Sequence, residues 1–242
     1  MTGAMPVRVI RDSGTSFRSR LKASARCRLT SVELRKIEIQ LAASAAYGKL
    51  PIWDGYLKIK NRPYDTFNSR SSGEVNTPQD YGRFYVGVVG QFQPKVIVEF
   101  GAGYGASGMY FLTGVARNCD GQLFSFEPNP AWASIARDNL AAIHSSYTLT
   151  TGTFEECVDS VVKSPIDLSF VDGIHTSEFV EAQFELLLVR MSPGGIIIFD
   201  DVNFSADMKT CWQKISEDPR IQASALIGSR QGIVQVDRAR RT

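Results

Sequence analysis

The feature that most constrains the fold is a regular alternation of apolar runs and amphipathic segments from Lys95 to Glu217. The apolar runs are short and rich in β-branched residues, which favours buried strands, and the segments between them have a helical period. This alternation predicts a mostly parallel sheet with helices on both faces. Strands are expected at 96–100, 122–126, 147–151, 166–171 and 195–199, and helices at about 106–117, 130–143, 154–163, 177–191 and 205–217.

The end of the chain has a different pattern. Residues 221–227 and 233–236 are two apolar runs, and the sequence Gly-Ser-Arg-Gln-Gly separates them at 228–232. Two strand-like runs joined by a short glycine-containing turn predict a hairpin. We therefore expect a terminal hairpin whose last strand is inserted antiparallel into the sheet.

A glycine-rich turn follows the first expected strand, in the sequence Glu99-Phe-Gly-Ala-Gly-Tyr-Gly105. Glycine allows a sharp turn and a close approach of the backbone to a ligand, and the helix expected from Ala106 would direct its free N–H groups at that ligand. Glu127 ends the second strand about 20 residues later, at the offset of a carboxylate that holds ribose hydroxyls. These features indicate a nucleoside-containing cofactor, and the turn alone leaves NAD binding open.

Acidic residues follow two later strands. Asp172 comes directly after the strand at 166–171, and Asp200 and Asp201 follow the strand at 195–199. The carboxyl ends of neighbouring parallel strands face the same crevice. Three carboxylates there would repel one another unless a cation neutralised them, and Mg²⁺ or another hard divalent ion suits oxygen ligands. The alternative for each aspartate is a helix cap or a turn residue.

Taken together, the glycine turn, Glu127-Pro128 and the closing hairpin resemble class I S-adenosylmethionine-dependent methyltransferases over roughly residues 75–236. The segments 167–175 and 194–203 are similar to strand ends of metal-dependent small-molecule O-methyltransferases. That group includes the catechol, caffeoyl-CoA and methyltransferase 24 types. The resemblance implies an α/β Rossmann-like fold with a seven-stranded, mostly parallel sheet, a C-terminal antiparallel hairpin, helices on both faces and an N-terminal helical or lid segment.

The resemblance also implies roles for individual residues. At the methionine end of S-adenosylmethionine it places Glu99, Gly101, Gly103 and Ser107. It places Glu127 at the ribose, Thr153 and Phe154 at the adenine, and Asp172 beside the cofactor. The implied ligands of a divalent cation are Asp172, Asp200 and Asp201.

His175 is the expected catalytic base. It aligns with the catalytic lysine of catechol-type enzymes, and an imidazole with an unperturbed pKa near 6.5 could accept the proton of a hydroxyl group. A water molecule or a metal-bound hydroxide is the alternative base. The other histidine, His144, falls at the end of an expected helix, where solvent exposure is expected.

These observations predict an S-adenosylmethionine-dependent O-methyltransferase that acts on a hydroxyl of a small molecule, such as a sugar, phenol or secondary metabolite, with help from a divalent cation. Three alternatives stay open. The first is a metal-independent methyltransferase whose aspartates are structural. The second is an NAD(P)-dependent oxidoreductase, which the closing hairpin disfavours. The third is a non-catalytic protein that binds nucleosides or RNA.

The charge distribution divides the 242-residue chain into a body and two basic ends. Residues 1–28 carry seven Lys/Arg and one Asp, and residues 237–242 carry three Arg and one Asp, so the body is acidic although the whole chain has a net charge of +2. We expect a flexible basic N-terminus at 1–28, a helix and lid segment at 29–90, the cofactor-binding domain at 91–236 and a basic tail at 237–242. Solvated tails are expected in preference to nucleic-acid contacts.

The N-terminal half of the chain also suggests its partners and location. Thr30-Ser-Val-Glu33 has the spacing of a capping box and predicts a helix that ends before Gly48, a candidate homodimer contact. No apolar run approaches the roughly 18 residues needed to cross a bilayer. The four cysteines have no metal-ligand spacing, which favours reduced thiols and a cytoplasmic protein.

Overall fold

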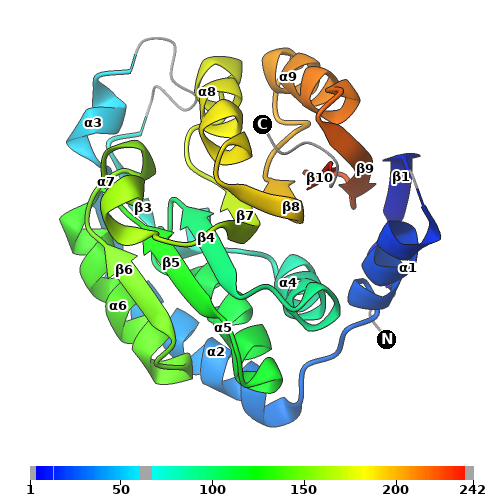
Figure 1. Ribbon diagram of the computed structural model, residues 1–242. Helices are drawn as coiled ribbons and strands as arrows, with labels where there is room; N and C mark the ends of the chain where they lie inside the picture. The colour runs from blue at the N-terminus through cyan, green and yellow to red at the C-terminus, as the bar shows by residue number, and fades with distance from the viewer. Residues whose placement is uncertain (1–3, 13, 60–66, 238–242) are drawn as a thin grey trace.

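The computed structural model describes residues 4–12, 14–59 and 67–237, and it contains one large mixed sheet with helices on both faces (Figure 1). Eight strands of the described residues form this sheet in the order β1, β9, β10, β8, β7, β4, β5, β6. These strands are β1 (Val7–Arg11), β4 (Val96–Phe100), β5 (Gln122–Phe126), β6 (Tyr147–Thr150), β7 (Ile166–Val171), β8 (Met191–Phe199), β9 (Ile221–Ile227) and β10 (Gln231–Val236).

Two hydrophobic cores lie on opposite faces of the sheet. Side chains of consecutive strand residues alternate between the faces, so Ile97 packs in one core and Val98 in the other. The first core includes side chains of α1 (Thr15–Ser24), α2 (Ser31–Ala45), α4 (Gln79–Phe92), α5 (Ala106–Asn118) and α6 (Pro130–Ile143). The second core includes side chains of α7 (Phe154–Val161), α8 (Ser177–Leu188) and α9 (Ala206–Glu217).

The topology of the sheet determines where a ligand can bind. Strands β6, β5, β4, β7 and β8 are parallel, and β4 lies between β5 and β7. The chain proceeds outward from β4 in one direction and returns to build β7 and β8 on the other side. The loops that leave β4 and β7 therefore diverge, which opens a crevice at the carboxyl ends of the strands.

The N-terminal region differs from the sequence-based expectation. Strand β1 pairs antiparallel with β9, with Val7 opposite Ile227 and Val9 opposite Ala225. Helix α1 then buries Phe17 and Leu21 in the first core. The prediction of a flexible segment over residues 1–28 is therefore wrong for β1 and α1, and the predicted seven-stranded sheet has eight strands.

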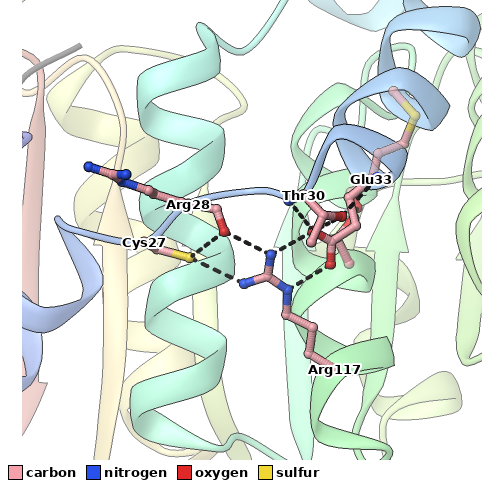
Figure 2. Close-up of polar contacts among 7 residues, drawn as sticks. Cys27, Arg28, Thr30, Glu33 and Arg117 are labelled. Carbon is pink, nitrogen blue, oxygen red and sulfur yellow. Dashed lines mark hydrogen bonds and ion pairs between the residues drawn. The ribbon is translucent and has the colours of Figure 1, made fainter. Parts of the chain in front are cut away.

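Arg117 ties the N-terminal helix α2 to α5 (Figure 2). The predicted capping box is present, with Thr30 and Glu33 exchanging hydrogen bonds at the start of α2. The Arg117 guanidinium donates to both carboxylate oxygens of Glu33, at 2.7 and 2.6 Å, and to the carbonyl oxygen of Arg28 at 2.9 Å. One carboxylate thus caps α2 and anchors it to α5.

We expect the substitution Glu33→Gln to lower the free energy of unfolding at pH 7 by about 1 kcal/mol, a value suited to a partly exposed pair. Hydrogen bonds from Arg117 hold the pKa of Glu33 at about 2, below its ordinary 4.5. A lowered carboxyl pKa contributes stability above pH 4.5 that is lost as the pH falls toward 2. In urea unfolding, the free energies of unfolding of the original protein and the Glu33→Gln variant should therefore differ less at pH 3 than at pH 7. Glu38→Gln on the exposed side of α2 is the control, and an equal loss there would contradict this account.

The described residues 46–59 and 67–78, here called the cover segment, form a partly structured cover at the carboxyl end of the sheet (Figure 1). It contains α3 (Asp54–Leu57), the 3₁₀ helix η1 (Ser72–Val75) and a small sheet of β2 (Lys49–Pro51) and β3 (Ser69–Ser71). Asn129 Nδ2 donates to the Pro51 carbonyl at 2.8 Å, and the Tyr104 hydroxyl donates to the Arg70 carbonyl at 2.9 Å. The cover is therefore anchored to the loops after β4 and β5.

In the described part of the chain, no helix combines the length and the apolar character that a bilayer crossing requires. Tyr64, an aromatic residue of the predicted lid, and residues 238–242 of the predicted basic tail lie outside the described residues.

Candidate active site

A cavity of about 370 Å³ lies where the crevice of the sheet meets the cover segment. This volume falls in the range of about 300–1,000 Å³ that is typical of small-molecule sites. Of the predicted site residues, all except Glu99 and Asp200 line the cavity. The lining residues from that set are Gly101, Gly103, Ser107, Glu127, Thr153, Phe154, Asp172, His175 and Asp201.

The glycine turn brings its backbone directly against the end of β7. Gly101 has a φ of +75°, and a Cβ atom there would lie 2.5 Å from the carbonyl oxygen of Asp172. The N–H groups of Gly101 and Ala102 both donate to the Phe126 carbonyl, at 3.0 and 3.1 Å. Only glycine fits this position, because a side chain would meet both a strained backbone and a fixed neighbour.

Glu127 lines the cavity beside the glycine turn. One carboxylate oxygen accepts a hydrogen bond from the Gly103 N–H at 2.7 Å, and the other accepts one from the Asn129 N–H at 2.8 Å. Burial raises the pKa of Glu127 to about 7, although these two hydrogen bonds act in the opposite direction. The carboxylate is therefore oriented by the glycine turn before any ligand binds.

Glu99 lies behind the turn and does not reach the cavity. It is fully buried, and it accepts hydrogen bonds from Ser107 Oγ at 2.5 Å and Ser125 Oγ at 2.6 Å. Burial raises its pKa, while the two serine hydroxyls lower it. Glu99 thus orients Ser107, the neighbour that does line the cavity.

The predicted adenine side of the cavity is mostly apolar. Thr153 caps α7 by accepting a hydrogen bond from the Glu156 N–H at 3.3 Å, and the next residue, Phe154, packs on Phe100 with ring centroids 3.8 Å apart. Gln183 Nε2 donates to Glu155 at 2.8 Å. Thr153 is therefore fixed as a helix cap, while Phe154 supplies an apolar wall of the cavity.

Three buried polar atoms on cavity-lining residues have no hydrogen-bond partner among the described residues. They are Asn76 Oδ1, Trp132 Nε1 and Gln183 Oε1. Buried polar atoms are usually paired, so these atoms are available to a bound ligand. Sequence reasoning missed all three residues, because an isolated Asn, Trp or Gln gives no pattern that marks a site.

His175 lies between two of the predicted aspartates at the other end of the cavity. Its Nε2 atom is 3.6 Å from Asp172 Oδ1 and 3.7 Å from Asp201 Oδ2. Burial lowers the pKa of His175, although the charges of Asp201 and Asp200 act to raise it. Burial raises the pKa of Asp172 well above its usual range, with a further increase from the charge of Asp200. These conditions favour a neutral imidazole that can accept a proton.

Asp200 does not line the cavity and pairs with Arg230, a lining residue that sequence reasoning missed. It is 3% exposed, and Arg230 donates to both its carboxylate oxygens, from Nε at 2.8 Å and from Nη2. Arg230 Nε also lies 2.9 Å from Asp201 Oδ1. Burial acts to lower the pKa of the Arg230 guanidinium. The hydrogen bonds to Asp200 and the charges of Asp200, Asp172 and Asp201 act in the opposite direction, and the pKa is raised.

Comparison with known proteins shows which proteins this chain resembles. Residues 98–202 match the model of the methyltransferase 24 family, which is described as a methyltransferase domain. A protein of Mycobacterium sp. (strain JLS), provisionally named an O-methyltransferase, is 33% identical over 110 residues, which cover 44% of this chain and 48% of that protein. The chain spans less than half the length of the curated relatives that it matches, 17% of one and 48% of the other.

Two solved structures have the same fold. The O-methyltransferase from Bacillus cereus in complex with SAH has a TM-score of 0.61 at 21% identity, over 84% of this chain and 90% of that one. The O-methyltransferase from Streptomyces achromogenes involved in tomaymycin synthesis, in complex with SAM, has a TM-score of 0.63 at 15% identity, over 89% and 93%. At these identities the likeness establishes the fold alone. Residues 98–202 thus match a methyltransferase domain, and the described chain shares its fold with these solved O-methyltransferases.

Proposed function

We propose that this protein is an S-adenosylmethionine-dependent O-methyltransferase that acts on a hydroxyl group of a small molecule. The observation that carries the proposal is the arrangement within one cavity. The glycine turn and Glu127 line it, and His175 lines it between Asp172 and Asp201. A nucleoside site and a candidate base thus share one enclosed space.

The residues around the cavity fit the cofactor. Glu127 is placed to accept hydrogen bonds from the ribose hydroxyls, because its two oxygens are already oriented by backbone N–H groups. The unpaired atoms of Gln183 and Trp132 are available to the polar edge of a base or an amino acid. S-adenosylmethionine bound here would supply an electrophilic methyl group on a sulfonium centre. The turn at Gly101 allows the backbone to approach that ligand closely.

We expect Glu127→Gln to weaken S-adenosylhomocysteine binding by about 10- to 100-fold, because charge-assisted hydrogen bonds to the ribose would be lost. In the unsubstituted protein the affinity should fall as the pH falls below about 7, the pKa at which Glu127 takes up a proton. A raised carboxyl pKa means that the ionised group costs the free protein stability as the pH rises through 7. Glutamine removes this cost but can accept only one of the two backbone hydrogen bonds, so the unfolding temperature of the variant should fall less at pH 8 than at pH 6.

Calorimetric titrations at pH 6 and pH 8, with thermal unfolding, test the Glu127 prediction. Asp138→Asn, on the exposed face of α6, is the matched control and should change neither property. A glutamine variant that binds S-adenosylhomocysteine as tightly as the original protein would exclude Glu127 from the ribose site.

His175 is the proposed base. A hydroxyl is a weak nucleophile until it loses its proton, and a neutral imidazole beside it can accept that proton in the transition state. Asp201 lies 3.7 Å from Nε2, and its negative charge would stabilise the imidazolium that forms. Phe204, with its ring centroid 6.1 Å from that of His175, limits the space around the imidazole.

The size of the cavity supports a small acceptor. About 370 Å³ must hold the reacting parts of both cofactor and acceptor. Trp53 and Tyr56 of the cover segment line the cavity with Phe179 of α8, so the acceptor would meet aromatic walls. A sugar, a phenol or another cyclic metabolite suits such walls.

The divalent cation that the sequence predicted stays a prediction, and the described residues do not fit the three-aspartate site. Arg230 already contacts both oxygens of Asp200, and Gln231 donates to one of them at 2.9 Å. No group of three or more His, Cys, Asp or Glu side chains in the described part of the chain is arranged to hold a metal ion. This observation favours the metal-independent alternative.

The experiment that tests the proposed function is a methyl-transfer assay. The full chain is incubated with methyl-labelled S-adenosylmethionine and a panel of small hydroxyl compounds, with and without EDTA. We expect label in at least one acceptor and an equal amount of S-adenosylhomocysteine. An oxidoreductase would instead use NAD(P)H and form no S-adenosylhomocysteine, and an RNA-binding protein would show salt-sensitive RNA binding without turnover.

Two further expectations from the sequence stay proposals. The four cysteines are free thiols, which supports a cytoplasmic protein. The exposed side chains of Val32 and Ile39 on α2 support a homodimer contact through the N-terminal helix.

A further inference from the structure

The position of Arg230 follows from the register of the sheet. Strand β10 runs antiparallel to β8, with Gly232 opposite Phe199. Continuing this register past the strand ends sets Gln231 opposite Asp200 and Arg230 opposite Asp201. The Val202 N–H donates to the Arg230 carbonyl at 2.9 Å, which holds the two segments together beyond the last strand pair.

The guanidinium contacts both members of the aspartate pair. Arg230 forms a bidentate contact with Asp200, and its Nε atom lies 2.9 Å from Asp201 Oδ1. The other oxygen of Asp201 is the one that faces His175, at 3.7 Å. One cation therefore joins the buried carboxylate to the carboxylate beside the proposed base.

The surroundings of Arg230 fix it in this position. Asn203 Nδ2 donates to the Ser229 carbonyl at 2.7 Å, which ties the preceding turn to the end of β8. On the other side, Gln231 Nε2 donates to Asp200 Oδ1 and to the hydroxyl of the fully buried Tyr85. Planar guanidinium–carboxylate pairs of this kind are geometrically specific.

A divalent ion and this guanidinium compete for the same carboxylate oxygens. Two cations at one pair of aspartates would repel each other, and the burial of Asp200 strengthens this repulsion. An ion that used Asp200 would have to displace a buried, bidentate pair, which leaves a charged group without its partner.

We propose that Arg230 is the resident cation of this site and a positioning residue of the proposed reaction. It neutralises Asp200 and holds Asp201 beside His175, in the place that a divalent ion would otherwise take. The inference rests on the proposed function for the role of His175, but the cation site itself can be tested without methyl transfer.

The experiment is a calorimetric titration of Mn²⁺ into the full chain, with and without saturating S-adenosylhomocysteine. We expect no stoichiometric binding to the original protein at up to about 1 mM Mn²⁺, whereas Arg230→Met should gain at least tenfold in affinity because its carboxylates have lost their cation. Arg220→Met is the matched control, since Arg220 also makes a bidentate carboxylate contact, with Glu185, outside the cavity. It should gain no Mn²⁺ affinity.

Stoichiometric Mn²⁺ binding to the original protein would overturn the proposal, and so would an Arg230→Met variant that folds and gains no affinity. If Arg230→Met does not fold, Arg230→Lys replaces it. The lysine variant retains the positive charge, so we expect it to fold and to bind no Mn²⁺. If it binds Mn²⁺ or fails to fold, the proposal is wrong. If the original protein does not bind S-adenosylhomocysteine, that result counts against the proposed function. The Mn²⁺ titration still tests the cation site in that case.

Discussion

Replacing Gly101 with alanine is expected to weaken S-adenosylhomocysteine binding more than 100-fold and to lower the free energy of unfolding by about 2–4 kcal/mol. The residue has a positive φ, and an added Cβ would lie 2.5 Å from the backbone oxygen of Asp172. The turn cannot move freely, because the N–H groups of Gly101 and Ala102 both donate hydrogen bonds to the Phe126 carbonyl. The end of β7 is also held, because the Asp172 N–H donates to the Phe100 carbonyl. The substitution should therefore displace the turn from the cofactor site.

Gly103→Ala is the matched control for Gly101. It also has a positive φ, of +55°, but an added Cβ would have no heavy atom within 4 Å. The Gly103→Ala substitution should lower the free energy of unfolding only by the backbone strain, about 1–2 kcal/mol. It should also weaken S-adenosylhomocysteine binding less than Gly101→Ala does. Calorimetry and urea unfolding compare the two variants. Equal losses would mean that backbone strain, and not the contact with Asp172, explains the requirement for glycine.

Replacing His175 with alanine is expected to lower the turnover number by about 10²- to 10⁴-fold, the usual contribution of a general base. S-adenosylhomocysteine affinity should fall far less than turnover, because the glycine turn and Glu127 keep their own hydrogen bonds in this variant. The pH profile adds a second signature. Burial lowers the pKa of His175, so the active neutral form should predominate above a pH somewhat below 6.5, and activity should rise through that pH.

The alanine variant should lose the rising limb of this pH profile along with its turnover. His144→Ala is the control, since His144 caps the end of α6 away from the cavity. If His175→Ala keeps more than half of the original turnover, a water molecule or another group is the base.

The cofactor side of the site could be predicted from the sequence because its signals are local. A short β-branched strand, a glycine turn and an acidic residue one βα unit later all lie between Val96 and Glu127 in the sequence, and the structure brings Gly101, Gly103 and Glu127 to one cavity. Glu99 shows the limit of such reading. Its motif position was recognised, but its burial behind the turn depends on Ser107 and Ser125, which only the folded chain brings together.

The aspartate pair shows why adjacent residues can have different partners. Both residues follow the end of β8 at Phe199, and both contact Arg230. Asp200 also accepts a hydrogen bond from Gln231, whereas Asp201, with a φ of +51°, faces His175. Arg230 could have been sought, because the predicted hairpin was expected to insert antiparallel. Its partner residue depends on a register between segments about 30 residues apart, which single-sequence patterns do not determine.

The N-terminal strand could not be predicted for a similar reason. Residues 7–11 mix three apolar side chains with two arginines and lie in an Arg-rich segment, so the composition of that segment indicated a solvated tail. Their partner strand β9 is more than 200 residues away in sequence, with Val7 opposite Ile227. Pairing at the sheet edge, and the packing of α1 that follows it, are tertiary effects that override local composition.

The central claim is that the glycine turn and Glu127 bind the methyl donor of a methyltransferase. The most direct test is a pair of calorimetric titrations of the full chain, one with S-adenosylhomocysteine and one with NADH. We predict a single site for S-adenosylhomocysteine with a dissociation constant in the micromolar range, and no heat of binding with NADH. Saturable NADH binding without S-adenosylhomocysteine binding would contradict the account and favour an oxidoreductase.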